Sequence, residues 1–219
     1  MGKEIDLLRN YPKAKRDLHK RLEQKNEFVR NVARKFEKEF FDGDRQYGYG
    51  GFNYNPKYWS EVVKDFVNYY KLSDQSKILD IGCAKGFMLY DFQKLNENFD
   101  LQGIDISEYA IKNSVESIKN KLKVGNAKAL PYEDNTFDLV IAINTIHNLE
   151  PEECSKSLKE ISRVSKKDSF ITVDAFNNDH EKKRMYAWNL TAKTIMSVDE
   201  WVKFFEKANY KGDYFWFIP

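Results

Sequence analysis

Residues 77–89, K-I-L-D-I-G-C-A-K-G-F-M-L, are the stretch on which the predicted fold depends. The apolar residues Ile78, Leu79 and Ile81 form a short run that is typical of a strand buried on both faces. Residues 82–86 interrupt this run with glycines, and residues 87–89 resume it with the composition of a helix. Glycine lets a ligand approach the main chain closely, and the helix start offers unpaired N–H groups. The stretch therefore predicts a strand, a glycine turn and a helix that together bind a polar ligand.

The spacing of the glycines indicates which nucleotide is bound. A dinucleotide-binding turn reads G-x-G-x-x-G, whereas here Gly82, Ala84 and Gly86 alternate and Phe87 stands in the place of the last glycine. NAD is therefore disfavoured. Residues 80–86, D-I-G-C-A-K-G, instead resemble the first motif of the class I S-adenosylmethionine-dependent methyltransferases, D/E-x-G-x-G-x-G, with Ala84 replacing the middle glycine. The resemblance implies that the methionine part of this cofactor lies along Asp80, Gly82, Cys83, Ala84 and Gly86.

Two later segments extend the resemblance to the nucleoside. Asp105 ends the predicted strand at residues 100–105, where adenosine-binding folds use a carboxylate to accept hydrogen bonds from both ribose hydroxyls. Its neighbour Ile106 is expected to pack against the adenine ring. Residues 125–132, G-N-A-K-A-L-P-Y, resemble the family segment G-D-A-x-x-L-P-F, with Asn126 standing for the acid. The resemblance implies that Asn126 and the backbone of Ala127 contact adenine.

The lip of the predicted fourth strand, residues 137–144, carries the catalytic candidate. Open α/β sheets place ligands at the carboxyl ends of their strands. The family has the methionine half of the cofactor and the acceptor at this place, so the resemblance implies cofactor binding by Asn144. His147 follows three residues later and is the candidate catalytic and acceptor-binding residue. A histidine here acts either as a general base or as a wall of the pocket, and the sequence leaves both readings open.

The fold class expected from these segments is α/β, with a doubly wound, mostly parallel, Rossmann-like sheet of the seven-stranded type. Only one terminal strand, at residues 214–218, fits where the family has an antiparallel pair, so a six-stranded sheet is the alternative. The core domain is expected at residues 73–219, with a substrate-side insertion at residues 176–196 that contains Trp188. Trp188 is a candidate acceptor-binding residue, and a surface helix is the alternative for the insertion.

Residues 1–72 are expected to form a helical and aromatic cap or lid. Apolar positions at helical spacing over residues 13–41 predict one long amphipathic helix, with a break near Lys25 as a variant, and this helix is also a candidate for homodimer contacts. Glycines and aromatic residues then alternate over residues 42–59. Tyr47 and Tyr49 are candidate acceptor-binding residues in this loop, and the alternative is that its rings pack the cap onto the domain.

Composition limits the partners. The 219 residues carry a net charge of +2, so no strong field favours nucleic acid or an anionic membrane. No apolar run is long enough to span a bilayer. The two cysteines, Cys83 and Cys154, are far apart and form no C-x-x-C pair, which favours a reducing cytoplasm and no metal site.

The expected function is transfer of a methyl group from S-adenosylmethionine to an oxygen or nitrogen atom of a small-molecule acceptor, of sugar, amine or aromatic type. The product of the donor is then S-adenosylhomocysteine. Two alternatives remain at this point: a methyltransferase acting on RNA or protein, and a catalytically silent S-adenosylmethionine-binding subunit.

Overall fold

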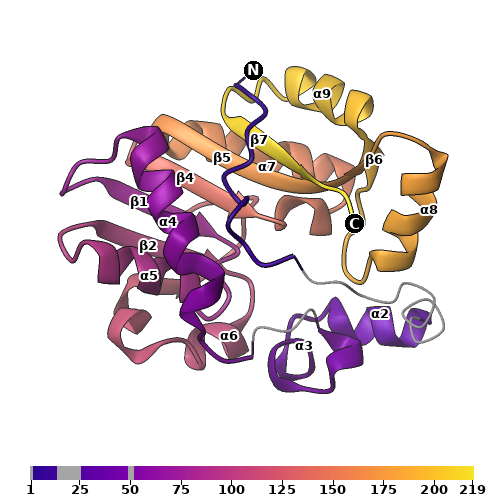
Figure 1. Ribbon diagram of the computed structural model, residues 1–219, viewed down its shortest axis with the longest axis horizontal. Coiled ribbons are helices and arrows are strands. Elements are labelled where there is room, and N and C mark those ends of the chain that lie inside the picture. The colour runs from indigo at the N-terminus through magenta and orange to yellow at the C-terminus, as the bar shows by residue number, and fades with distance from the viewer. Residues whose placement is uncertain (1, 14–25, 49–51) are drawn as a thin grey trace.

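Seven strands form a sheet flanked by helices in this computed structural model, which describes residues 2–13, 26–48 and 52–219 (Figure 1). The strands are β1 Lys77–Ile81, β2 Asp100–Asp105, β3 Leu122–Val124, β4 Phe137–Ile143, β5 Ser165–Phe176, β6 Met196–Ser197 and β7 Asp213–Phe217. Their order is β3-β2-β1-β4-β5-β6, β7 also pairs with β5, and all of these pairs are parallel. The predicted Rossmann-like α/β class is confirmed, with seven strands rather than six.

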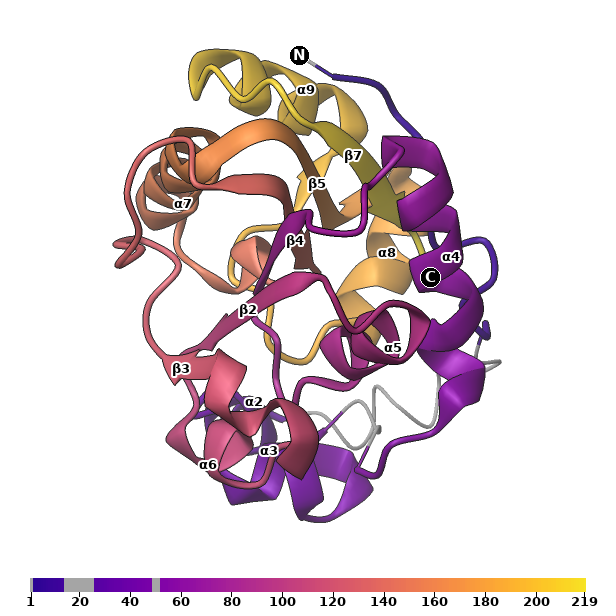
Figure 2. The ribbon, with the colours of Figure 1, turned by 90° about the vertical axis from the view of Figure 1, so that its left-hand side faces the viewer.

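The helices cover both faces of the sheet. They are α2 Glu27–Ala33, α3 Lys38–Asp42, α4 Pro56–Tyr70, α5 Phe87–Leu95, α6 Glu108–Lys112, α7 Pro151–Val164, α8 Asp179–Trp188 and α9 Val198–Lys207. Short 3₁₀ helices are η1 Arg45–Tyr47, η2 Glu116–Lys121 and η3 Ile146–Asn148. Helices α4 and α5 pack on one face, and α7 and α9 on the other (Figure 2).

The two faces are covered by separate apolar clusters. Leu79 of β1 packs with α7 and α9, whereas its neighbour Ile78 packs with α4 and α5, because successive side chains of a strand point to opposite faces. Leu139 and Val140 of β4 divide in the same way. This double burial explains why β1 and β4 are continuous apolar runs.

The C-terminal edge of the sheet differs from the family pattern. Strand β7 pairs parallel with β5, so no antiparallel strand is found among the described strands. On its other side, Tyr214 donates to the carbonyl of Lys3 and accepts from the N–H of Ile5, both at 3.0 Å. Residues 3–5 therefore extend the sheet next to β7. This part of residues 1–72 covers a sheet edge instead of forming a cap.

The expected single helix over residues 13–41 is wrong for its described part. Helix α2 ends at Ala33 and α3 begins at Lys38, and between them Phe36 has a left-handed φ of +53°. The rings of Phe36 and Phe40 pack edge to face at 5.2 Å across this turn, so the apolar spacing continues although the helix does not. Residues 14–25, including the variant break near Lys25, lie outside the described residues.

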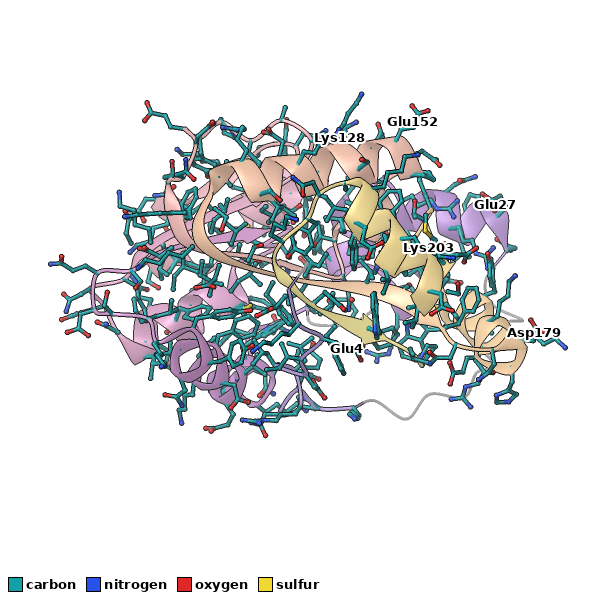
Figure 3. The ribbon with its side chains drawn as sticks, turned by 90° about the horizontal axis from the view of Figure 1, so that it is seen from above. Glu4, Glu27, Lys128, Glu152, Asp179 and Lys203 are labelled. Carbon is teal, nitrogen blue, oxygen red and sulfur yellow. The ribbon has the colours of Figure 1, made fainter. Side chains whose placement is uncertain are left out.

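Helix α2 lies beside the segment that follows α8. Val29 and Ala33 of α2 are buried against Leu190, and Tyr47 packs against the same cluster. Glu27 of α2 and Asp179 of α8 lie toward the same end of the molecule when it is seen from above (Figure 3). Helix α4, by contrast, packs on the sheet through Phe66, so it belongs to the layer of the core domain although it precedes residue 73.

Candidate active site

The corner after β1 is built from residues with left-handed backbone angles. Gly82 has a φ of +78°, Ala84 of +51° and Gly86 of +77°. A Cβ on Gly82 would also lie 2.2 Å from Oγ1 of Thr145, so only glycine fits there. The N–H of Gly82 donates to the carbonyl of Ile104 at 2.7 Å. The turn therefore holds the end of β1 against the end of β2 and under the lip of β4.

Asp105 points into this corner. Its Oδ2 accepts the N–H of Ala84 and its Oδ1 accepts the N–H of Ser107, both at 2.8 Å. Burial raises the pKa of Asp105 above its ordinary value, although these backbone N–H groups partly offset the effect. Each carboxylate oxygen can accept a second hydrogen, so both oxygens are suited to bind a pair of hydroxyl groups as well.

Asp80 is a second buried carboxylate in the same corner. Burial, followed by the negative charge of Asp105, raises the pKa of Asp80 to about 7. No described lysine, arginine or histidine forms an ion pair with either carboxylate. Two buried acids without a counter-ion favour a cationic ligand, because a positive charge placed between them offsets their desolvation and their mutual repulsion.

A cavity of about 120 Å³ opens at the corner. It is lined by Trp59, Asp80, Gly82, Cys83, Ala84, Lys85, Phe87, Met88 and Ile143. The structure thus brings together the predicted methionine-side residues except Gly86 and Asn144, which flank this cavity without lining it. Five lining residues were not predicted as site residues: Trp59, Lys85, Phe87, Met88 and Ile143. Phe87 could have been predicted from its place directly after the last glycine. Trp59 lies in α4 and lines the cavity only because of the tertiary fold.

The predicted adenine side has an apolar surface next to Asp105. Ile106 is 55% exposed and Val124, at the end of β3, is 48% exposed, which is unusual for such large apolar side chains. Asn126 uses its Oδ1 to accept the N–H of Lys128 at 3.0 Å, so its side-chain NH₂ group and the second lone pair of Oδ1 are what it can offer to a base. Contact of Ile106, Asn126 and Ala127 with adenine stays a prediction.

Asn144 is held in an unusual conformation at the lip of β4. Its φ is +48°, and its Oδ1 accepts the hydroxyl of Thr172 at 2.8 Å, while that hydroxyl oxygen accepts the backbone N–H of Asn144 at 2.9 Å. Strained backbone at a sheet lip is a common property of ligand sites. Thr172 of β5 therefore holds both the backbone and the carboxamide of Asn144.

His147 is buried in η3, behind this lip. Its Nδ1 accepts the backbone N–H of Asp174 at 2.8 Å, and it lies 3.7 Å from Oδ1 of the same residue. Its carbonyl accepts the N–H groups of Lys193 and Thr194. Burial lowers the pKa of His147, with the charge of Asp174 acting in the opposite direction. Because Nδ1 is an acceptor, the neutral ring carries its proton on Nε2.

The predicted acceptor-binding residues other than His147 have different packing partners where the structure describes them. Tyr47 packs in the cluster of Val29, Ala33 and Leu190. The chain continues from Leu190 to Lys193, whose N–H donates to the carbonyl of His147. The ring of Trp188 lies 5.3 Å from that of Phe217 in β7. Tyr49 lies outside the described residues. Acceptor binding by these three side chains stays a prediction.

A larger hollow of about 410 Å³ lies elsewhere, lined in part by Leu72, Asp74, Asn96 and Phe99. These residues precede β1 and β2, so the hollow is at the amino ends of the strands, opposite the corner. Among the described residues, no group of three or more His, Cys, Asp or Glu side chains is arranged to hold a metal ion. None of the described helices combines the length and apolar composition of a membrane span.

A parallel doubly wound sheet with a positive-φ corner and a carboxylate at the tip of β2 defines a nucleoside-binding α/β domain. Comparisons with known proteins specify it further. Residues 72–209 match a family described as "Methyltransferase domain". This is more than half of the chain, and the chain belongs to that family. The prediction of a class I S-adenosylmethionine-dependent methyltransferase, with S-adenosylmethionine as the cofactor, is confirmed.

Two curated proteins and one solved structure are similar to parts of this chain, and the solved structure shares its fold. Carboxy-S-adenosyl-L-methionine synthase from Nautilia profundicola is 32% identical over 116 residues, 52% of this chain and 47% of that protein. The tRNA (carboxymethyluridine(34)-5-O)-methyltransferase of Arabidopsis thaliana is 33% identical over 135 residues, 60% of this chain and 31% of that protein. A SAM-dependent methyltransferase structure from Methanosarcina mazei superposes with a TM-score of 0.53 at 22% identity, covering 65% of this chain and 82% of the other. The chain spans less than half the length of these two curated relatives.

Proposed function

We propose that this protein transfers the methyl group of S-adenosylmethionine to an oxygen or nitrogen atom of a small-molecule acceptor. The observation that carries the proposal is the pair of buried carboxylates, Asp80 and Asp105, with which no described cation forms an ion pair. S-adenosylmethionine has two cationic groups, a sulfonium and an ammonium, together with a ribose diol. The residues present therefore fit this cofactor in both charge and hydrogen bonding.

Each part of the corner has a separate task in the proposal. Asp105 accepts the ribose hydroxyls, and Ile106 and Val124 provide an apolar surface for adenine. Asp80, in its ionised form, attracts the ammonium group of the methionine part. The cofactor itself supplies a methyl group that is already activated by a positive sulfur.

The contribution of the chain to such a transfer is mainly alignment. Well-oriented intramolecular reactions reach effective molarities of ~10⁵ to 10⁸ M, which corresponds to about 7 to 11 kcal/mol. The corner is suited to this task because tertiary contacts fix it on two sides, through Ile104 and through Thr145. No group of catalytic acids and bases is needed for a nucleophile that enters deprotonated.

We propose that His147 is a positioning residue. It would then hold the lip of β4 in place and would not act as a general base. Its Nδ1 is engaged by the N–H of Asp174, and burial keeps the ring neutral. The ring can therefore donate a hydrogen bond from Nε2, but it can accept a proton only at Nδ1 and only after the bond to Asp174 breaks. An amine acceptor fits such a site better than an alcohol that needs a strong base.

An RNA acceptor is the second candidate. It is favoured by the similarity to a tRNA methyltransferase, which is 33% identical over 60% of this chain. The net charge of +2 favours a small molecule instead. The two candidates differ in salt dependence, because binding through several phosphates weakens steeply as salt rises. Silent cofactor binding without transfer is the third outcome.

A transfer assay with methyl-labelled S-adenosylmethionine tests all three. Fractionated metabolites and total tRNA are supplied separately, and the label is followed into the acceptor fraction. Label in a small-molecule fraction supports the proposal. Label only in tRNA supports the second candidate, and donor binding by calorimetry without any transfer supports a silent subunit.

A further inference from the structure

Lys85 places a positive charge at the donor corner, and Asp42 and Phe52 of the N-terminal segment bind it. Of the described residues that line the cavity at the corner, Lys85 is the cation. Its Nζ lies 2.5 Å from Oδ1 of Asp42, at the end of α3, and donates to the carbonyl of Phe52 at 2.9 Å. Only 7% of the Lys85 side chain is exposed. One ammonium group thus joins both ends of the segment between residues 42 and 52 to the turn after β1.

Asp42 is well suited to hold this ammonium group. Its second oxygen, Oδ2, accepts the hydroxyl of Tyr109 from α6 at 2.8 Å, which fixes the carboxylate on the other side. Burial raises the pKa of Asp42, but the hydrogen bonds from Lys85 and Tyr109 outweigh it and hold the pKa below its ordinary value. Asp42 is therefore ionised at neutral pH and neutralises Lys85.

The alternative partners of Lys85 are the two donor-site carboxylates. Asp80 lines the same cavity, and the causes of the raised pKa of Asp80 and Asp105 include no cation. With Asp42 present, the ammonium group is directed to the cap and the negative charge of the corner remains for a ligand. Without Asp42, the flexible lysine stem would let the ammonium group turn toward Asp80 and compete with a cationic ligand.

We propose that Asp42 is a specificity-determining residue for the donor: it holds the Lys85 ammonium group away from Asp80 and Asp105, and so preserves a corner that prefers a cationic sulfonium ligand over its neutral thioether product. The inference rests on the proposed function, because it assumes that S-adenosylmethionine binds at this corner. It also makes the cap part of the donor site, since Asp42 belongs to α3.

Calorimetric titration with S-adenosylmethionine and with S-adenosylhomocysteine tests this. The two ligands share the nucleoside and the amino acid but differ by the methyl group and the charge on sulfur. In Asp42→Asn, the Kd is expected to rise for both ligands, because the freed Lys85 ammonium group competes for Asp80 with the ammonium group that both ligands carry. The rise should be about threefold larger for S-adenosylmethionine, because only this ligand also has a positive sulfur that the freed charge repels. In the double variant with Lys85→Met, the ratio of the two Kd values returns to that of Lys85→Met alone.

A matched control is Glu39→Gln, which removes a negative charge from an exposed position of the same helix and should leave the ratio unchanged. Equal weakening of both ligands in Asp42→Asn, or a ratio that Lys85→Met does not restore, would overturn the inference. Failure of the wild-type protein to bind either ligand would instead contradict the proposed function. If the wild-type protein binds both ligands and Asp42→Asn has the same ratio of the two Kd values, only the inference about Asp42 is contradicted.

Discussion

The backbone N–H of Ala84 donates to Oδ2 of Asp105 at 2.8 Å, although the two residues are 21 positions apart in the chain. The bond joins the turn after β1 to the tip of β2. It also aims the carboxylate into the corner, as the assignment to a nucleoside-binding site requires. The same oxygen that orients the turn is the one proposed to receive a ribose hydroxyl, so the two motifs form one structural unit.

Replacing Asp105 should weaken donor binding strongly. Hydrogen bonds to a charged group contribute about 1.5 to 3 kcal/mol each, so the loss of a carboxylate that binds two hydroxyls predicts a rise in Kd of at least about tenfold for Asp105→Asn. Calorimetry with S-adenosylhomocysteine measures it. Asp100→Asn, at the exposed start of the same strand, is the control and should leave Kd unchanged. Equal affinity of the Asp105 variant and the wild type would remove Asp105 from the site.

Asp80 predicts a pH dependence of donor binding. Its pKa is raised to about 7, so the ionised form that attracts a cation is half populated near neutral pH. Affinity for S-adenosylmethionine should therefore increase as pH rises through about 7 and level off above it. Calorimetry across this range checks the profile, and Asp80→Asn should abolish the step. A wild-type profile without a step would show that the ionisation of Asp80 does not control binding.

The same shift predicts the sign of an effect on stability. A carboxyl group whose folded-state pKa is raised contributes stability that is fully present below about pH 4 and is lost as pH rises through about 7. Asp80→Asn keeps the shape and removes the charge, so it should raise the free energy of unfolding more at about pH 8 than at about pH 4.5. Urea denaturation at the two pH values measures this. A larger increase in the free energy of unfolding at the acidic pH would contradict a buried Asp80 carboxyl group with a raised pKa.

His147 can be tested by separating its structural from its chemical contribution. His147→Ala leaves the N–H of Asp174 unpaired, which should cost about 1 to 3 kcal/mol of stability. His147→Asn retains an acceptor near the position of Nδ1. For a positioning residue, His147→Asn lowers turnover more than donor affinity and keeps the shape of the pH–rate profile of the wild type. Loss of the acidic limb of that profile in His147→Asn would instead identify His147 as a general base.

Local sequence signals predicted those elements whose causes are local. The apolar runs of β1 and β4 indicated strands, and Ser107 caps α6 as its type and position suggest, with Oγ accepting the N–H of Ala110 at 3.0 Å. Ser197 and Glu200 form a capping box at the start of α9, which is a contact of the same local kind. In each case, the relevant partners lie within a few residues of one another.

Features that depend on tertiary contacts were not predicted. The break at Phe36 preserves the apolar spacing of a helix, so periodicity alone does not reveal it. Strand β6 has 2 residues and depends on its pairing with β5. The contact of Asp42 with Lys85 joins residues 43 positions apart, and neither residue belongs to a motif that requires the other. The family motif located the corner, but it could not reveal what neutralises the lysine within it.

Ala84 is the one departure from glycine in the corner, and its cost should be measurable. Its φ of +51° is left-handed, which costs a residue with a Cβ about 1 to 2 kcal/mol, while glycine loses about 0.5 to 1 kcal/mol through the greater freedom of the unfolded chain. Ala84→Gly should therefore raise the free energy of unfolding by about 0.5 to 1 kcal/mol in urea denaturation. The control is Ala208→Gly, at a φ of −77°, which should lower it. Because the N–H of residue 84 still donates to Asp105 in the glycine variant, donor affinity should stay within about threefold of wild type. A destabilised Ala84→Gly would mean that the methyl group of Ala84 contributes packing that outweighs the strain.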